Sequence, residues 1–232
     1  MTSDRIVDLP AGRSTEPSVH HATALADAAY TTIKERIRTC QLAPGQRITE
    51  KGLVEDTGYG KTPVREGLGR LVNEQLVDVM PRSGYRVRSL TLQDVDEVFE
   101  AWRIAWPEVV VLASRRITPA DMDVLRAMAF DERGAVRDDY AMFRFVLAMA
   151  RNRRLAAMLD RVLDEIERLA HLLARQGVAT QLPQADARIR KSFVTHDEAA
   201  LRESVLRWID AYYSSALQAL RQLPAVRGAA LI

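Results

Sequence analysis

The run GYGKTPVREGLGRLVNEQLVDVMPRSGYRV, residues 58–88, constrains the fold more than any other part of the chain. Pro63 suits a first helical turn, because the backbone N–H that it lacks would have no partner there. Two short segments, 77–80 and 85–88, are predicted to pair as strands around a turn at Arg82-Ser83-Gly84. The helix between Pro63 and these strands has apolar residues at the spacing of a face that packs on a core: Val64, Leu68, Leu71 and Val72. This order of turn, helix and hairpin predicts a winged helix-turn-helix.

The residues before this run fit the same arrangement. A helix is expected over residues 23–39, with one apolar face made of Ala26, Ala29, Tyr30, Ile33 and Ile37. After a turn at Pro44-Gly45, Thr49 is the expected N-cap of a short helix that ends at Gly58. The basic helix then spans about residues 62–75.

From Thr91 onward the sequence is helical, and no strand pattern appears after residue 90. Thr91 is the expected cap of the first helix, and a long amphipathic helix follows Asn152. The predicted fold is therefore mainly α, with an N-terminal winged helix-turn-helix and a C-terminal all-helical bundle. The predicted divisions are a flexible tail at 1–21, the winged domain at 22–89, the helical domain at 90–224 and a C-terminal tail at 225–232.

Composition limits the cellular context. The 47% hydrophobic content is enough for a packed core, yet we find no apolar stretch of the roughly 18 residues that a membrane span needs. The N-terminal residues lack the apolar region of a secretory signal. The single cysteine, Cys40, is interpreted as a small apolar residue in a reducing compartment. We therefore expect a cytoplasmic protein without a membrane partner.

Positive charge is concentrated in the winged region. Residues 30–88 hold 11 Lys and Arg against 7 Asp and Glu, an excess of four, whereas residues 91–232 hold 20 of each. Within the basic helix, Lys61, Arg65 and Arg70 lie on or near the face opposite the apolar one, and the helix start offers free N–H groups. These features suit entry into a major groove and contact with phosphates, so double-stranded DNA is the predicted partner.

The segment LAPGQRITEKGLVEDTGYGKTPVREGLGRLVNEQLV, with the wing PRSGYRV, resembles the GntR family of bacterial transcription regulators. The resemblance implies a dimer, most often a repressor, that binds a palindromic operator. It also implies that Gly84, at the wing tip, approaches the minor groove beside Arg82. The predicted DNA-binding residues are Lys51, Lys61, Thr62, Arg65, Arg70, Arg82 and Gly84.

Two departures from the family pattern fall in the basic helix. Most members have arginine where Lys61 stands, and lysine cannot form the bidentate contact to guanine O6 and N7. Gly67 and Gly69 each replace a better helix former, at a cost of roughly 1 kcal/mol relative to alanine. The lysine predicts a shifted base preference, and the two glycines predict a less stable helix.

The helical region resembles the FCD effector-binding domain of the FadR-type subfamily, through EVFEAWRIAWPEVVVLAS, DDYAMFRFVLAMARNRRL and HDEAALRESVLRWIDA. Many such domains hold a divalent metal with one Asp and three His. The matching positions here are Asp139, Phe143, Asp186 and Trp208, so only Asp139 remains as the expected ligand and no metal cofactor is predicted. Two carboxylates could at most hold a hard ion weakly.

The same resemblance places Arg103 where related domains have an arginine in the effector cavity. A buried arginine needs a partner, either a ligand anion or a carboxylate such as Asp139 or Asp186. If Arg103 binds a ligand anion beside Phe143 and Trp208, the predicted effector is a small organic acid with an apolar part. The equal alternative is an internal ion pair of Arg103 with a carboxylate, with Phe143 and Trp208 as ordinary core residues.

Three functions are weighed. The first is a dimeric DNA-binding regulator, a repressor whose helical domain senses a small organic acid. The alternative is a constitutive DNA-binding dimer whose bundle has lost sensing and serves dimerisation or protein docking. An enzyme is not expected, because we find no nucleophile–base pair and no Gly-rich phosphate loop; Glu165 and Glu167 are interpreted as part of a solvated helix face.

Overall fold

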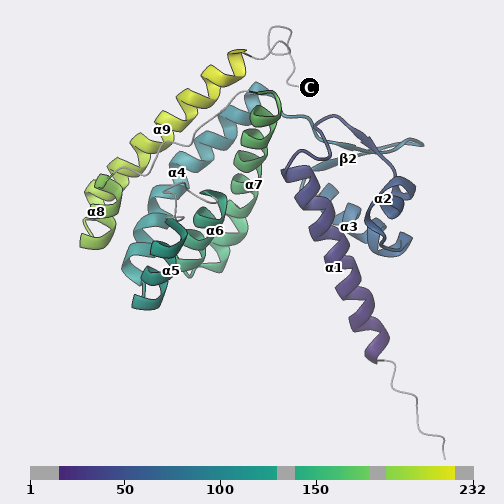
Figure 1. Ribbon diagram of the computed structural model, residues 1–232, viewed down its shortest axis with the longest axis horizontal. Helices are drawn as coiled ribbons and strands as arrows, with labels where there is room; N and C mark the ends of the chain where they lie inside the picture. Colours follow the sequence, from purple (N-terminus) through teal and green to yellow (C-terminus); the bar gives the residue numbers. More distant parts are fainter. Residues whose placement is uncertain (1–15, 130–138, 178–186, 223–232) are drawn as a thin grey trace, which may run out of the picture.

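The computed structural model describes residues 16–129, 139–177 and 187–222. They form a smaller N-terminal domain with a three-stranded sheet and a larger helical domain. Helix α7 (Arg153–Arg175) of the larger domain lies along the boundary (Figure 1). The predicted fold class, mainly α with a winged helix-turn-helix followed by a helical bundle, is confirmed. The predicted tails at 1–15 and 225–232 lie outside the described residues.

The N-terminal domain contains α1 (Glu16–Arg38), α2 (Glu50–Thr57) and α3 (Lys61–Asn73). The expected inner face of α1 is buried at Ala26, Ala29, Ile33 and Ile37, and α1 packs along α3. The helix begins at Glu16, so the prediction of a tail through residue 21 was wrong for its last six residues. Residues 16–25 contain no glycine, and Pro17 falls in the first turn, where proline is tolerated.

The caps of α2 agree with the sequence prediction. The Thr49 hydroxyl accepts a hydrogen bond from the Gly52 N–H at 3.0 Å, and Gly58 ends the helix in the left-handed conformation with φ of 76°. These caps satisfy backbone groups that a helix of eight residues leaves open at its ends. They hold α2 and α3 at the tight turn that defines the motif.

The sheet contains β1 (Arg47–Ile48), β2 (Val77–Met80) and β3 (Gly84–Val87) in the order β1-β3-β2, with both pairs antiparallel. The predicted hairpin is confirmed, with Met80 opposite Gly84. Strand β1 was not predicted, because two residues are too few to show an alternating pattern.

Gly67 has a packing role that helix propensity alone does not show. It is buried against α1, and a Cβ built at Gly67 would lie 3.0 Å from the Tyr30 backbone nitrogen and 3.1 Å from its Cα. The missing side chain thus permits a close approach of α1 and α3. Gly69 is exposed and has no such neighbour within 4 Å.

The helical domain is built around α4, which contacts α6, α7, α8 and α9. Thr91 caps the start of α4 as predicted, and Asp94 completes a reciprocal capping box that the sequence analysis did not name. The helices are α4 (Leu92–Arg116), α5 (Pro119–Ala129), α6 (Asp139–Met149), α7 (Arg153–Arg175), α8 (Ala187–Thr195) and α9 (Glu198–Gln222).

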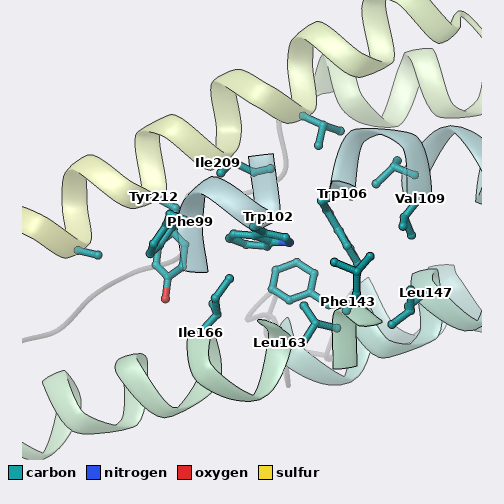
Figure 2. Packing of buried hydrophobic residues seen from close by; sticks show 14 of the residues in the cluster. Phe99, Trp102, Trp106, Val109, Phe143, Leu147, Leu163, Ile166, Ile209 and Tyr212 are labelled. Carbon is teal, nitrogen blue, oxygen red and sulfur yellow. The ribbon is translucent and has the colours of Figure 1, made fainter. Parts of the chain in front are cut away.

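Aromatic side chains form the centre of the bundle core (Figure 2). Trp102 of α4 is fully buried between α6 and α9, and its ring centroid lies 5.5 Å from Phe143 and 6.1 Å from Tyr212. Most of these ring pairs meet edge to face or tilted, arrangements that aromatic pairs prefer. Among the described helices, none is both long and apolar enough to cross a bilayer.

Candidate functional site

The first turns of α3 form an exposed polar surface. Lys61, Thr62 and Arg65 are exposed, whereas Val64 is buried beneath them. The N-cap residue Gly60 makes no side-chain capping hydrogen bond. Glycine has no side chain that could cap the helix and Pro63 has no N–H, so the N–H groups of Lys61 and Thr62 receive no side-chain cap and can bind an anion, with the positive end of the helix dipole behind them.

Arg65 is held in a bidentate ion pair with Glu50, the first residue of α2. The Arg65 Nε donates to Glu50 Oε1 at 2.9 Å, and Nη2 donates to Oε2 at 3.0 Å. The hydrogen bond from Arg65 holds the pKa of the Glu50 carboxyl below its ordinary value, and a hydrogen bond with Tyr85 of β3 acts in the same direction. Glu50 thus brings the starts of α2, α3 and the wing together at one edge of the domain. Arg65 still has Nη1 free of this pair to face a ligand.

Lys51 and the wing tip extend the exposed surface. The Lys51 side chain is 87% exposed and lies 3.8 Å from Glu55 in a surface ion pair. At the tip of the wing, Pro81, Arg82 and Ser83 are exposed, and Arg82 has a positive φ of 62°. Both cations can therefore turn toward a bound polyanion with little loss of existing contacts.

Arg70 does not share this surface. Its guanidinium carbon lies 3.7 Å from the centroid of the Tyr30 ring, and Nη1 donates to Asp27 at 2.5 Å. At 3.6 residues per turn, Arg70 is about 140° round the helix from Arg65. The structure thus separates Arg70 from the other predicted DNA-binding residues and uses it to hold α1 on α3.

Gly84 has a packing role in the sheet, and its approach to the minor groove stays a prediction. It lies inside β3, and the tip of the wing is formed by residues 81–83. Gly84 has φ of 87°, and a Cβ there would lie 2.7 Å from the Ile48 carbonyl oxygen of β1. The close approach that requires glycine is therefore between strands of the sheet.

In the bundle, the positions predicted to line an effector site are packed with aromatic rings. Phe143 is buried, and its centroid lies 5.6 Å from those of Trp106 and Trp208. Trp208 in turn stacks on Tyr212 at 6.2 Å. Asp186 lies outside the described residues, and Asp139 is described only as the first residue of α6.

Arg103 is directed to the side of the bundle. Its Nε donates to Asp210 of α9 at 2.6 Å, and its guanidinium carbon lies 4.4 Å from the Tyr213 ring centroid. Its side chain is 31% exposed and that of Asp210 is 59% exposed. The alternative of an ion pair between Arg103 and a protein carboxylate therefore agrees with the structure, but the partner is Asp210, which the sequence analysis did not name.

The donor atoms do not fit the metal centre of related domains. Phe143 and Trp208 carry no lone pair that binds a metal. Within the part of the chain that the structure describes, no three His, Cys, Asp or Glu side chains gather as a potential metal site. The absence of a metal cofactor stays a prediction.

The exposed basic helix and its adjoining wing define a winged helix-turn-helix DNA-binding domain. Residues 25–87 match the family described as "Bacterial regulatory proteins, gntR family". The N-terminal domain belongs to this family.

Curated relatives match over less than half of this chain. The HTH-type transcriptional regulator McbR of Escherichia coli is 31% identical over 96 residues, which are 41% of this chain and 43% of McbR. The uncharacterized HTH-type transcriptional regulator YdhC of Bacillus subtilis is 34% identical over 71 residues, 31% of this chain and 32% of YdhC. These alignments span less than half the length of the relatives.

Solved structures extend the likeness in fold to the bundle. E. coli McbR/YncC superimposes with a TM-score of 0.71 over 84% of this chain and 97% of that chain, at 20% identity. A putative transcriptional regulator GntR from Rhodococcus sp. RHA1 gives 0.63 over 86% and 98%, at 17% identity. The arrangement of both domains is thus shared with these regulators.

Sequence reasoning missed two partner residues in these sites. Glu50 lies 15 positions before Arg65, and Asp210 lies 107 positions after Arg103. Neither pair has a helical spacing that a pattern along one element could show.

Proposed function

We propose that this protein is a transcriptional regulator that binds a palindromic DNA operator as a homodimer and represses the adjoining genes. One recognition helix offers few base contacts, so two heads on a symmetric site multiply the specific part of the binding free energy. Repression is supported by the relative named HTH-type transcriptional repressor GlaR of E. coli, which is 33% identical over 72 residues, 31% of this chain and 33% of GlaR.

The exposed start of α3 is the observation that carries this proposal. Lys61, Thr62 and Arg65 surround a helix N-terminus whose backbone amides remain open, and Lys51 and Arg82 flank it. Lys61 acts as a point charge on phosphate, and Arg65 keeps Nη1 for a base edge or phosphate. Glu50 holds the Arg65 guanidinium against α2, so little side-chain freedom is lost on binding.

The test is selection of bound duplexes from a random DNA pool, followed by affinity measurements on the enriched site. We expect an inverted repeat, and Arg65→Ala should weaken its binding by roughly 1–3 kcal/mol. Arg70→Ala is the matched control, since the Arg70 guanidinium is bound to α1, and should weaken binding much less. Equal losses for the two variants, or none for Arg65→Ala, would contradict the proposed docking.

We further propose that the helical domain senses a small organic acid. Binding of this ligand changes the relative orientation of the two DNA-binding domains in the dimer. The fold shared with GntR regulators through the bundle supports a regulatory domain at this place. A thermal-shift screen with aliphatic and aromatic acids tests it, because a ligand that binds the folded state raises the unfolding temperature.

A second candidate has a specific observation in its favour. Phe143 and Trp208 fill the predicted ligand positions by packing against Trp102, which suits a bundle that serves only dimerisation or protein docking on a constitutive DNA binder. If no acid in the screen raises the unfolding temperature while the operator is still bound, this candidate replaces the sensor.

A further inference from the structure

Two carboxylates of α7 are buried at the boundary between the domains. Asp164 is 4% exposed and Glu167 is 7% exposed. The interpretation of Glu167 as part of a solvated face was therefore wrong, because α1 covers this side of α7. Glu165 is largely covered too, and burial raises the pKa of its carboxyl above the ordinary value.

The cations that meet these carboxylates come from α1 of the DNA-binding domain. Lys34 Nζ lies 2.7 Å from Asp164 Oδ2, and Arg38 Nε lies 3.2 Å from Glu167 Oε2. Lys34 also lies 3.1 Å from Glu74, at the end of α3. Two cations one helical turn apart thus face two carboxylates about one turn apart across the boundary.

A third cation comes from the bundle itself. Arg144 of α6 donates to Asp164 at 2.7 Å and to Glu167 at 3.2 Å, and it also binds Asp160 at 2.6 Å. Other titratable neighbours are Glu35, which pairs with Arg38, and His171, whose Nε2 lies 3.9 Å from Glu167. The Tyr30 hydroxyl accepts a hydrogen bond from Lys34 at 3.1 Å. Both carboxylates are therefore contacted by cations from two sides: Lys34 and Arg38 of the winged domain on one side, and Arg144 of the bundle on the other.

The electrostatic balance depends on this contact. Burial raises the pKa of Glu167, and the charges of Arg38 and Arg144 oppose that rise. For Lys34, burial disfavours the charged form, but the hydrogen bond and charge of Asp164 outweigh it and raise its pKa. The winged domain thus supplies part of the positive charge that balances Glu167, and the bundle supplies the carboxylate that favours the charged form of Lys34.

The apolar part of the boundary is small. The apolar cluster that the described residues form there consists of Cys40, Leu90 and Leu172. Beside it, Arg168 donates to the Arg88 carbonyl, and the Cys40 thiol lies 3.5 Å from the Arg168 carbonyl oxygen. A contact with so little apolar area is set mainly by the geometry of its charges.

We propose that Asp164 and Glu167 are positioning residues for DNA recognition, which fix the orientation of the winged domain on the bundle by binding Lys34 and Arg38. The orientation passes to the recognition helix because α1 and α3 are in close contact at Gly67. Buried ion pairs add little net stability compared with apolar packing, but a network with fixed partners favours one arrangement over others.

Cys40 provides a readout that needs no DNA. It is the only cysteine in the chain, it is 1% exposed, and undocking of α1 from α7 removes the cover given by Leu172. The rate at which a thiol reagent such as 5,5′-dithiobis(2-nitrobenzoic acid) modifies the native full-length protein therefore reports how often the boundary opens.

The variants are Lys34→Met, Asp164→Asn and the two combined. For each variant, the rate of Cys40 modification is compared with the free energy of unfolding that urea denaturation of the same protein gives. We expect each single change to speed modification about tenfold, and the double change to add little more, because either change alone already breaks the Lys34–Asp164 pair across the boundary. Arg115→Met removes an exposed pair with Glu198 elsewhere on the bundle and should leave the rate unchanged. The proposal would be overturned if the modification rates did not change, or if the two single changes had independent effects that multiply in the double variant. It would also be overturned if the rates rose only in proportion to the loss of global stability.

A DNA measurement extends the test to recognition and rests on the proposed function. Inverted repeats with increasing spacer length are compared for binding to the parent protein and to Asp164→Asn. We expect one preferred spacing for the parent and a broader preference for the variant. The same narrow preference in both, despite faster Cys40 modification, would overturn a positioning role. If no repeat binds either protein, the proposed function fails while the Cys40 result still judges the boundary.

Discussion

The two domains place their aromatic and basic residues in opposite ways. In the winged domain, basic residues stay at the surface around the exposed start of α3, over an aliphatic core. In the bundle, the positions that a ligand site would use are filled by rings around Trp102. A surface site formed by one continuous segment can keep its exposed residues when the core beneath it changes. The shape of an interior site depends on every side chain that packs around it.

The largest effect should come from breaking the aromatic core. Trp102→Ala removes a fully buried ring that contacts Phe143, Trp208 and Tyr212, and should lower the free energy of unfolding by about 3–5 kcal/mol. Urea unfolding followed by circular dichroism measures it. A cost below 1 kcal/mol would mean that the rings leave a loosely filled cavity, which would favour a ligand site there.

The next effect separates two glycines of the recognition helix. Gly67→Ala should destabilise the winged domain by about 1–3 kcal/mol, because its Cβ would press on the Tyr30 backbone. Gly69→Ala, two residues on and exposed, should stabilise the helix by up to about 1 kcal/mol. Thermal unfolding of both variants gives the signs. The same sign for both would show that helix propensity, and not contact with α1, governs Gly67.

A matched pair of helix caps compares the domains directly. Thr49→Ala in the winged domain and Thr91→Ala at the start of the bundle each remove a capping hydrogen bond from a backbone N–H, at a cost of about 1 kcal/mol. Thr91→Ala also removes the hydrogen bond that the Thr91 hydroxyl donates to the Asp94 carboxylate. Hydrogen exchange should show the loss of protection confined to α2 in the first case and to the first turns of α4 in the second. Loss of protection in both domains from either change would indicate a single cooperative unit.

The smallest effect concerns Arg103. Its pair with Asp210 is partly exposed, so Arg103→Met should change the free energy of unfolding by only about 0–1 kcal/mol. It should also leave any acid-induced rise in unfolding temperature unchanged. A rise that disappears in this variant would return Arg103 to the ligand site that the sequence first suggested.

Features of this protein that depend on residues close together in the sequence could be predicted from the sequence, whereas contacts between distant residues could not. The helices, caps and hairpin of the winged domain depend on neighbours within a few positions, such as Thr49 with Gly52 or Met80 with Gly84, and they were predicted. The exposed face of α3 follows from its helical period, and Lys61 and Arg65 lie on it as expected.

By itself, the sequence determined the class of fold and the surface that the DNA-binding domain presents, because helical period, caps and charge pattern act over short distances. Only the tertiary structure decided the partners: Arg70 on Tyr30, Gly84 against Ile48, Arg103 with Asp210, and the α7 carboxylates with α1. Each of these contacts joins separate elements, and the charge or shape of one residue does not specify which of many complementary residues the fold will bring beside it.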